Sequence, residues 1–301
     1  MTQPIALSHK GEAVEEWTDL HFFRPLGMRL VRLLAPTGVS ADQVTVAALL
    51  VGLAAGHLFF YRSAALNALG LLLFVLSDIL DSADGQLARL RGNSTRMGRV
   101  LDGISDNLRF VNLYFHLIAR LLVAHAMAPA ALAILAVLAG YSHSLQAGVA
   151  DYLRQVYLYV AYGIGELDLP EDVASGPAAS PLARLGLLIY AGYVARQAAW
   201  CSGSVAVVRA VRRGAAGERL AEQWRERQTA PVRRCALIAQ NVRFLLLAVT
   251  ALPGWPAGFL WLTVGPLNLA LAWVLIGHER TAARLARSGR TAPELVVAES
   301  L

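Results

Sequence analysis

Cysteine, lysine and charged side chains in general are scarce in this 301-residue chain. Its two cysteines, Cys201 and Cys235, have no metal-site spacing, and Lys10 is the single lysine. Charged residues make up 16% of the chain against 56% hydrophobic residues, and the mean hydropathy is +0.49. Because a typical soluble domain contains about 25% charged residues, this composition excludes an ordinary soluble protein and predicts a membrane protein.

The first 20 residues lack the apolar core of a secretory signal. Four acidic residues interrupt them: Glu12, Glu15, Glu16 and Asp19. We therefore expect no cleaved leader. Residues 11–34 alternate charge with apolar bulk, which predicts an amphipathic segment on the membrane surface, divided into two short helices by Pro25. This segment would serve either as a topological anchor or as a lid.

Long hydrophobic runs are plentiful. Five stretches are apolar enough to enter a bilayer: 43–61, 66–77, 121–142, 236–253 and 255–277. A polar hairpin at 78–110 would extend the second span and open the third. Ser40 and Gln43 form a capping-box pattern at the head of the first span. The sequence thus predicts an all-α integral membrane protein, a six-transmembrane-helix bundle with an N-terminal interfacial amphipathic helix.

These spans suggest three parts of the chain. Residues 1–40 would be an N-terminal interfacial segment and residues 41–280 the membrane domain, with residues 281–301 as a cytoplasmic tail. A helical insertion at about 163–234 would lie on the cytoplasmic face, since a seventh span would move an arginine cluster to the outside.

Arginine placement predicts the orientation. Clusters lie at 24–32, 89–99, 209–234 and 280–290, whereas the connections near 62–65, 124–130 and 253–256 hold only Arg62. The positive-inside rule then places both termini in the cytoplasm. This topology, with attraction to anionic membrane lipid, accounts for the net charge of +6, so we expect no nucleic-acid partner. Cytoplasmic cysteines also predict no disulfide.

The most informative stretch runs from Asp81 to Asp106. In helices, Asp81 and Asp84 share one face, and so do Asp102 and Asp106. Two such pairs facing each other across a helical hairpin would form a four-carboxylate cup. Unpaired carboxylates near a bilayer are costly, so the cup suggests bound cations. A purely structural network of aspartate–arginine pairs is the alternative, but it leaves the glycines of the stretch unexplained.

The same stretch resembles the signature of the CDP-alcohol phosphotransferases, D-x2-D-G-x2-A-R-x8-G-x3-D-x3-D. Eight positions match it: Asp81, Asp84, Gly85, Ala88, Arg89, Gly98, Asp102 and Asp106. Members of that family are integral membrane enzymes that cleave a CDP-linked donor. They pass its phosphoryl-alcohol portion to a hydroxyl acceptor, and the resemblance implies the same reaction class here.

The resemblance also implies roles for single residues. Asp81, Asp84, Asp102 and Asp106 would hold two Mg²⁺ or Mn²⁺ ions, with Asp106 also acting as the general base. Gly85, Gly98 and Ala88 would let the nucleotide approach closely, and Arg89 would contact donor phosphate. Asp78, one turn before Asp81, would contact the nucleotide or cap the cluster. Thr45 is the single residue carried over from the donor-contact turn of the family.

The acceptor is left open by the sequence. Candidate pocket residues are Arg109, His143, Arg154 and Arg243, although topology alone also favours arginines at these helix ends. Family analogy favours CDP-diacylglycerol as donor and a small polar alcohol as acceptor, in a bacterial inner membrane with the active site facing the cytoplasm. Transfer from CDP-choline or CDP-ethanolamine to diacylglycerol is an alternative, and a helical transporter or ion-binding protein is a remote one. A homodimer is left open.

Overall fold

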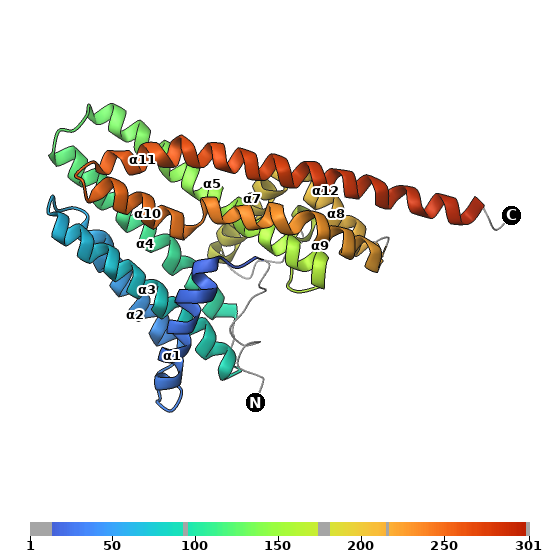
Figure 1. Ribbon diagram of the computed structural model, residues 1–301, viewed down its shortest axis with the longest axis horizontal. Coiled ribbons are helices and arrows are strands. Elements are labelled where there is room, and N and C mark those ends of the chain that lie inside the picture. Colours follow the sequence, from blue (N-terminus) through green and yellow to red (C-terminus); the bar gives the residue numbers. More distant parts are fainter. Residues whose placement is uncertain (1–13, 93–95, 174–180, 215–216, 299–301) are drawn as a thin grey trace. The chain divides into compact units, whose positions relative to one another are not determined.

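The computed structural model of the protein describes residues 14–92, 96–173, 181–214 and 217–298 (Figure 1). Within these ranges the side chains of residues 96–104, 181–183, 185, 186, 189 and 288–298 fall outside the description. Every regular element of the described ranges is a helix, so the all-α prediction is confirmed.

The helices follow one another with short connections. Those of the first half are a π-helical turn η1 (Asp19–Phe23), α1 (Arg24–Leu34), α2 (Ala41–Leu58), α3 (Ala64–Leu90), α4 (Arg96–Val123) and α5 (Pro129–Tyr162). Those of the second half are α6 (Pro170–Val173), α7 (Pro181–Trp200), α8 (Ser202–Arg212), α9 (Glu218–Arg233), a 3₁₀ turn η2 (Arg234–Ile238), α10 (Gln240–Ala251), α11 (Pro256–Val264) and α12 (Pro266–Ala298).

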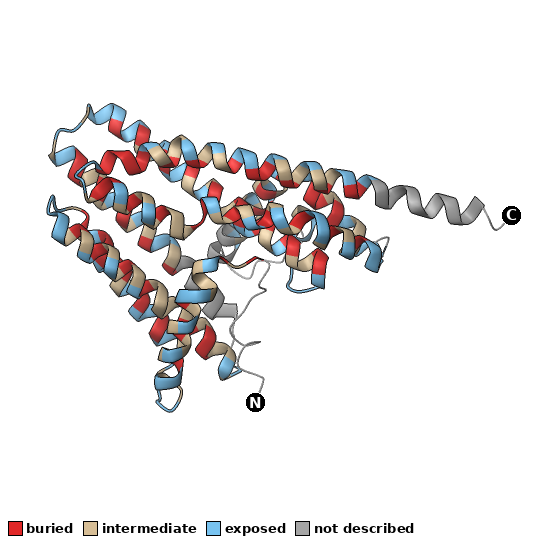
Figure 2. Ribbon diagram, viewed as in Figure 1, coloured by how far each residue is buried: buried red, intermediate tan, exposed pale blue. Residues whose placement is uncertain are grey.

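Five segments of the described chain are long and apolar enough to cross a membrane: Ala41–Leu58, Ala64–Leu90, Pro129–Tyr162, Glu218–Ala251 and Pro256–Arg287. Many of their apolar side chains, such as Leu72, Val137 and Leu269, are exposed on the outer faces of the helices (Figure 2). Helix α4 carries the polar half of the motif and is not among the five, so a count of six spans stays a prediction.

The chain divides into two compact units. Unit 1 consists of residues 1–143 and 240–266, and unit 2 consists of residues 144–239 and 267–301. Helix α5 begins in unit 1 and continues into unit 2, and α12 lies almost wholly in unit 2. All signature residues belong to unit 1.

The N-terminal segment differs from the expected pair of separate helices. The π-helical turn η1 passes directly into α1, and Pro25 lies in the first turn of α1. A proline there needs no N–H partner, so the chain changes helix type without a break. At the other end of α1, Arg91 Nη2 donates to the carbonyl oxygen of Thr37 at 2.9 Å, which ties the α1–α2 turn to the end of α3. The predicted capping box of Ser40 and Gln43 is present at the start of α2.

Helix α2 packs closely against both α3 and α4. Two glycines one turn apart make the approach to α4 possible. A methyl group at Gly52 would lie 2.4 Å from Cδ of Arg109, and one at Gly56 would lie 2.4 Å from Nδ2 of Asn112. Asn112 then donates to the Leu53 carbonyl at 2.8 Å. This small-residue face, of the kind that packs membrane helices, brings α4 and its arginine to the position described below.

We expect Gly52→Ala to destabilise the protein, because the new methyl group would displace the Arg109 side chain. Overpacking of this kind costs about 1–3 kcal/mol. Gly140→Ala is the matched control, since Gly140 lies in α5 with open space around its Cα. There the substitution should be neutral or stabilise by about 0.4–1 kcal/mol. Thermal unfolding in detergent would measure both, and equal unfolding temperatures would contradict this account of α2–α4 packing.

In unit 2, polar contacts hold the short helices in place. Glu279 on α12 accepts from the Gly203 and Ser204 amides at 2.5 and 3.2 Å, and so caps the N-terminus of α8. Helix α6 is joined to α8 by ion pairs such as Glu171–Arg209, in which the hydrogen bond from Arg209 lowers the pKa of Glu171 to about 2. This attraction is present above the ordinary glutamate pKa and is lost as the pH falls towards 2.

Candidate active site

The signature residues lie on two neighbouring helices of unit 1. Asp78, Asp81 and Asp84 follow one another along α3, and Asp106 lies on α4. The end of α3 and the start of α4 form the helical hairpin that the sequence predicts at 78–110. Asp102 and Gly98 also lie on α4, but their surroundings fall outside the described residues.

Arg109 lies at the centre of the carboxylates. Its Nη2 donates to Asp81 Oδ1 at 3.0 Å and to Asp106 Oδ1, while its Nη1 donates to Asp78 Oδ1 at 3.2 Å and to Ser77 Oγ at 2.8 Å. The arginine side chain is buried, whereas Asp106 is 44% exposed. Three acidic side chains from two helices therefore converge on one guanidinium. Sequence reasoning assigned Arg109 to the acceptor pocket, and the structure instead places it in the carboxylate cluster.

Asp84 is held from a third helix. Its Oδ2 accepts a hydrogen bond from Thr45 Oγ1 on α2 at 2.6 Å, and both residues are buried. The Thr45 hydroxyl also lies 3.2 Å from the carbonyl of Ala41, one turn earlier in α2. The structure thus brings Thr45 to the signature residues, as its assignment to the donor site requires.

Arg89 lies on the same face of α3 as Gly85. A methyl group at Gly85 would lie 3.4 Å from Nη1 of Arg89, so the guanidinium folds back over the glycine. The charges of Asp84, Glu15 and Arg24 act on this guanidinium. Ala88, which precedes Arg89 in the chain, is partly buried. Arg89 thus places a cationic side chain beside the carboxylate cluster.

Two amides at the start of α10 join this site, and sequence reasoning did not assign them to it. Gln240 Nε2 donates to Asp78 Oδ1 at 2.7 Å. Asn241 Nδ2 donates to Glu16 Oε2 and Thr18 Oγ1, each at 2.7 Å. The sequence does offer one indication of their role, because these two polar residues interrupt the apolar stretch 236–253.

Of the acceptor-pocket candidates, His143 and Arg243 come together. His143 Nδ1 lies 3.2 Å from the hydroxyl of Tyr114, and its ring packs edge-on against Phe110 at 4.4 Å between centroids. The charge of the buried Arg243 acts on both His143 and Tyr114. Since Arg243 follows Gln240 by one helical turn, this polar group lies next to the carboxylate cluster along α10. Arg154 lies further along α5, in unit 2.

The carboxylates suit a hard cation in their chemistry. Asp81 and Asp106 direct one oxygen each at the same nitrogen of Arg109, so two oxygen ligands from different helices already converge on a point. Among the described side chains, no three carboxylate, imidazole or thiol groups meet as a metal site, and Asp102 is not among those side chains. The donor set fits a divalent ion that would take the place of the guanidinium.

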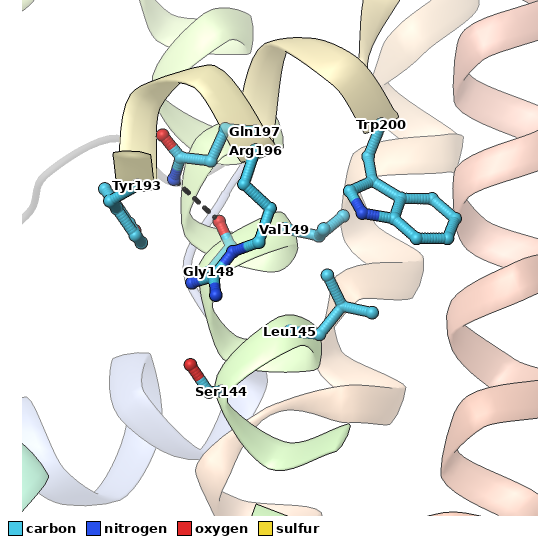
Figure 3. A pocket seen from close by; sticks show the side chains of 8 residues that line it. All are labelled: Ser144, Leu145, Gly148, Val149, Tyr193, Arg196, Gln197 and Trp200. Carbon is cyan, nitrogen blue, oxygen red and sulfur yellow. Dashed lines mark hydrogen bonds between the residues drawn. The ribbon is translucent and has the colours of Figure 1, made fainter. Parts of the chain in front are cut away.

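A shallow hollow in unit 2 is separate from these residues. It lies between α5 and α7 and is lined in part by Gly148, Tyr193, Arg196 and Trp200, with Gln197 donating to the Gly148 carbonyl at 3.1 Å (Figure 3). It contains none of the predicted site residues. The chemistry therefore points to the carboxylate cluster of unit 1.

Comparison with known proteins agrees with the motif. Residues 39–166 match the family model described as CDP-alcohol phosphatidyltransferase. This segment is similar to the CDP-alcohol phosphatidyltransferase family. The predicted resemblance is thereby confirmed, and it extends well beyond the eight signature positions, although the match covers less than half of the chain.

One curated protein to which this chain is similar is an archaetidylinositol phosphate synthase of Pyrococcus horikoshii. The two are 32% identical over 87 residues, which amount to 29% of this chain and 45% of the relative. The chain thus spans a little under half the length of the relative it matches.

Proposed function

We propose that this protein transfers a phosphatidyl group from CDP-diacylglycerol to a small polar alcohol and releases CMP, as a step of phospholipid synthesis in a bacterial inner membrane. The observation that carries the proposal is the convergence of Asp78, Asp81 and Asp106 on one cation within the segment that matches the family. Arginine topology supports an active site that faces the cytoplasm, where CMP would leave.

In the proposed reaction, the acceptor hydroxyl oxygen attacks the phosphorus of the phosphatidyl group. The bond from that phosphorus to the oxygen of the CMP phosphate breaks, and CMP leaves with the bonding electrons. The carboxylate of Asp106 takes the hydroxyl proton. Arg89 holds the donor phosphates by charge-assisted hydrogen bonds.

Asp81, Asp84, Asp102 and Asp106 would hold Mg²⁺ or Mn²⁺ ions. When bound, such ions neutralise the diphosphate and the charge that develops on the leaving phosphate. Protein side chains position the carboxylates: Thr45 orients Asp84, and Gln240 orients Asp78. His143, Tyr114 and Arg243 supply a polar group suited to the acceptor.

The test is an assay with purified full-length protein in detergent. Radiolabelled CDP-diacylglycerol and Mg²⁺ or Mn²⁺ would be offered with a panel of acceptors, namely glycerol 3-phosphate, inositol, inositol phosphate, serine and choline. A parallel series would offer CDP-choline or CDP-ethanolamine with diacylglycerol, and chelation by EDTA is the control. CMP release that requires both metal and one acceptor is expected in the first series. Release in the second series alone would show that the CDP-linked amino alcohol is the donor and diacylglycerol the acceptor. The absence of metal-dependent CMP release in both series would refute the proposal.

A further inference from the structure

Residues 14–24, which precede the family match, lie beside the arginine assigned to the donor phosphates. Glu15 and Arg24 form an ion pair with 3.4 Å between Oε1 and Nη2, and their side chains are only 6% and 15% exposed. Both charges act on the guanidinium of Arg89, together with the charge of Asp84. Arg24 is thus a second arginine close to the donor side of the carboxylate cluster.

Contacts with α3 fix Arg24 in this place. Gln86 Nε2 donates to the Arg24 carbonyl at 3.2 Å, and Gln86 lies one turn before Arg89. One turn after Arg24, a methyl group at Gly27 would lie 2.9 Å from Oγ of Ser82, so α1 and α3 touch closely. The first turn of α1 therefore has a defined register on the signature helix.

The other side of the segment is held by α10. Asn241 bonds Glu16 and Thr18 at 2.7 Å each, and its neighbour Gln240 bonds Asp78. Residues 14–24 are thus tied to two of the helices that form the site. A segment that served only to hold the N-terminus on a membrane surface would not need these contacts. Arg29 and Arg32, later in α1, are exposed, as a surface role requires.

The charges around Arg24 favour an anionic ligand. Arg24 pairs with Glu15, and the charges of both residues act on Arg89 together with the charge of Asp84. If Asp84 binds a divalent ion, its negative charge is balanced by that ion, and Arg24 and Arg89 remain beside Glu15. A diphosphate carries the additional negative oxygens that such a pair of guanidinium groups binds well.

We propose that Arg24, held in place by Glu15, is a second phosphate-binding arginine for the nucleoside diphosphate part of the donor. This inference rests on the proposed function, because it assumes that a CDP-linked donor occupies the carboxylate cluster. It adds residues of the N-terminal segment to a site that the signature describes with α3 and α4 alone.

The test is binding of CDP with Mg²⁺ to the full-length protein in detergent, followed by calorimetry. Arg24→Ala should weaken CDP binding by about tenfold or more, as loss of a charge-assisted contact does. Arg24→Lys keeps the charge without the fork of donors and should recover part of the affinity. Arg29→Ala is the matched control, an exposed arginine of the same helix, and should bind CDP as the wild type does.

Equal CDP affinities of Arg24→Ala and wild type, or equal losses in Arg24→Ala and Arg29→Ala, would overturn this inference while leaving the proposed function intact. A wild-type protein that does not bind CDP in the presence of Mg²⁺ would instead count against the proposed function itself. Thermal unfolding of each variant checks its fold. If Arg24→Ala does not fold, CDP binding is measured with Arg24→Gln instead. An affinity of that variant for CDP equal to that of the wild type would contradict the proposal.

Discussion

Replacing Asp106 by asparagine should lower kcat by a factor of about 10²–10⁴, the usual contribution of a general base. The amide has nearly the same shape and can still accept a hydrogen bond from Arg109, but it cannot take the proton of the acceptor hydroxyl. Because Asp106 is the most exposed of the three carboxylates around Arg109, an incoming acceptor can reach it. CMP release with saturating donor and acceptor would measure the change.

The affinity for CDP should change little in Asp106→Asn, since the other aspartates and Arg89 remain. Asp42→Asn is a suitable control, because Asp42 is an exposed residue in the first turn of α2 and makes no described contact with the cluster. It should turn over normally. Normal turnover of Asp106→Asn would refute its role as the base, and a parallel loss of CDP affinity would indicate a role in binding instead.

Arg109→Gln should destabilise the protein strongly in the absence of divalent ions. The substitution removes the cation that Asp78, Asp81 and Asp106 share, so their negative charges would face one another across α3 and α4. Breaking a buried ion pair costs about 3–5 kcal/mol. Since Asp81 and Asp106 are 30% and 44% exposed, solvent screens part of this repulsion, and we expect a loss at or below the lower end of that range.

Divalent ions should reverse much of that loss. Thermal unfolding with EDTA and with Mg²⁺ would show a larger metal-induced increase of the unfolding temperature in Arg109→Gln than in the wild type. Arg120→Gln provides the comparison, since Arg120 is a buried arginine of the same helix that donates to the Phe59 carbonyl and to Asn67 rather than to a carboxylate. The change in unfolding temperature caused by Arg120→Gln should be the same with EDTA and with Mg²⁺. The same dependence on Mg²⁺ in both variants would contradict the proposed exchange of guanidinium and metal.

The sequence predicted the local features of the site well. Apolar runs and capping residues located the starts of α2 and α3 to within two residues, and the polar stretch 78–110 contains the turn between α3 and α4. These features depend on interactions within a few turns of one helix.

Contacts between segments that are far apart in the chain could not be predicted from the sequence. Gln240 lies 162 positions after Asp78, and no periodicity shows which helix face meets which. For the same reason Arg109 was named only as a candidate of the acceptor pocket, since its contacts with Asp78 and Asp81 join two different helices. The later helices also differ from expectation. The apolar stretch 236–253 contains the end of η2 and all of α10, while α12 continues to Ala298 through the segment predicted as a tail.

The division of the chain into two units has a practical consequence for truncation. The family match runs from 39 to 166, whereas unit 1 consists of residues 1–143 and 240–266. A fragment trimmed to the matched segment would lose Arg24, Gln240 and Arg243, and would keep the end of α5 without the helices of unit 2 that pack on it. The smallest piece expected to retain the chemistry is thus discontinuous in sequence, and shortening should be attempted between residues 144 and 239 or after residue 266 rather than at the N-terminal end.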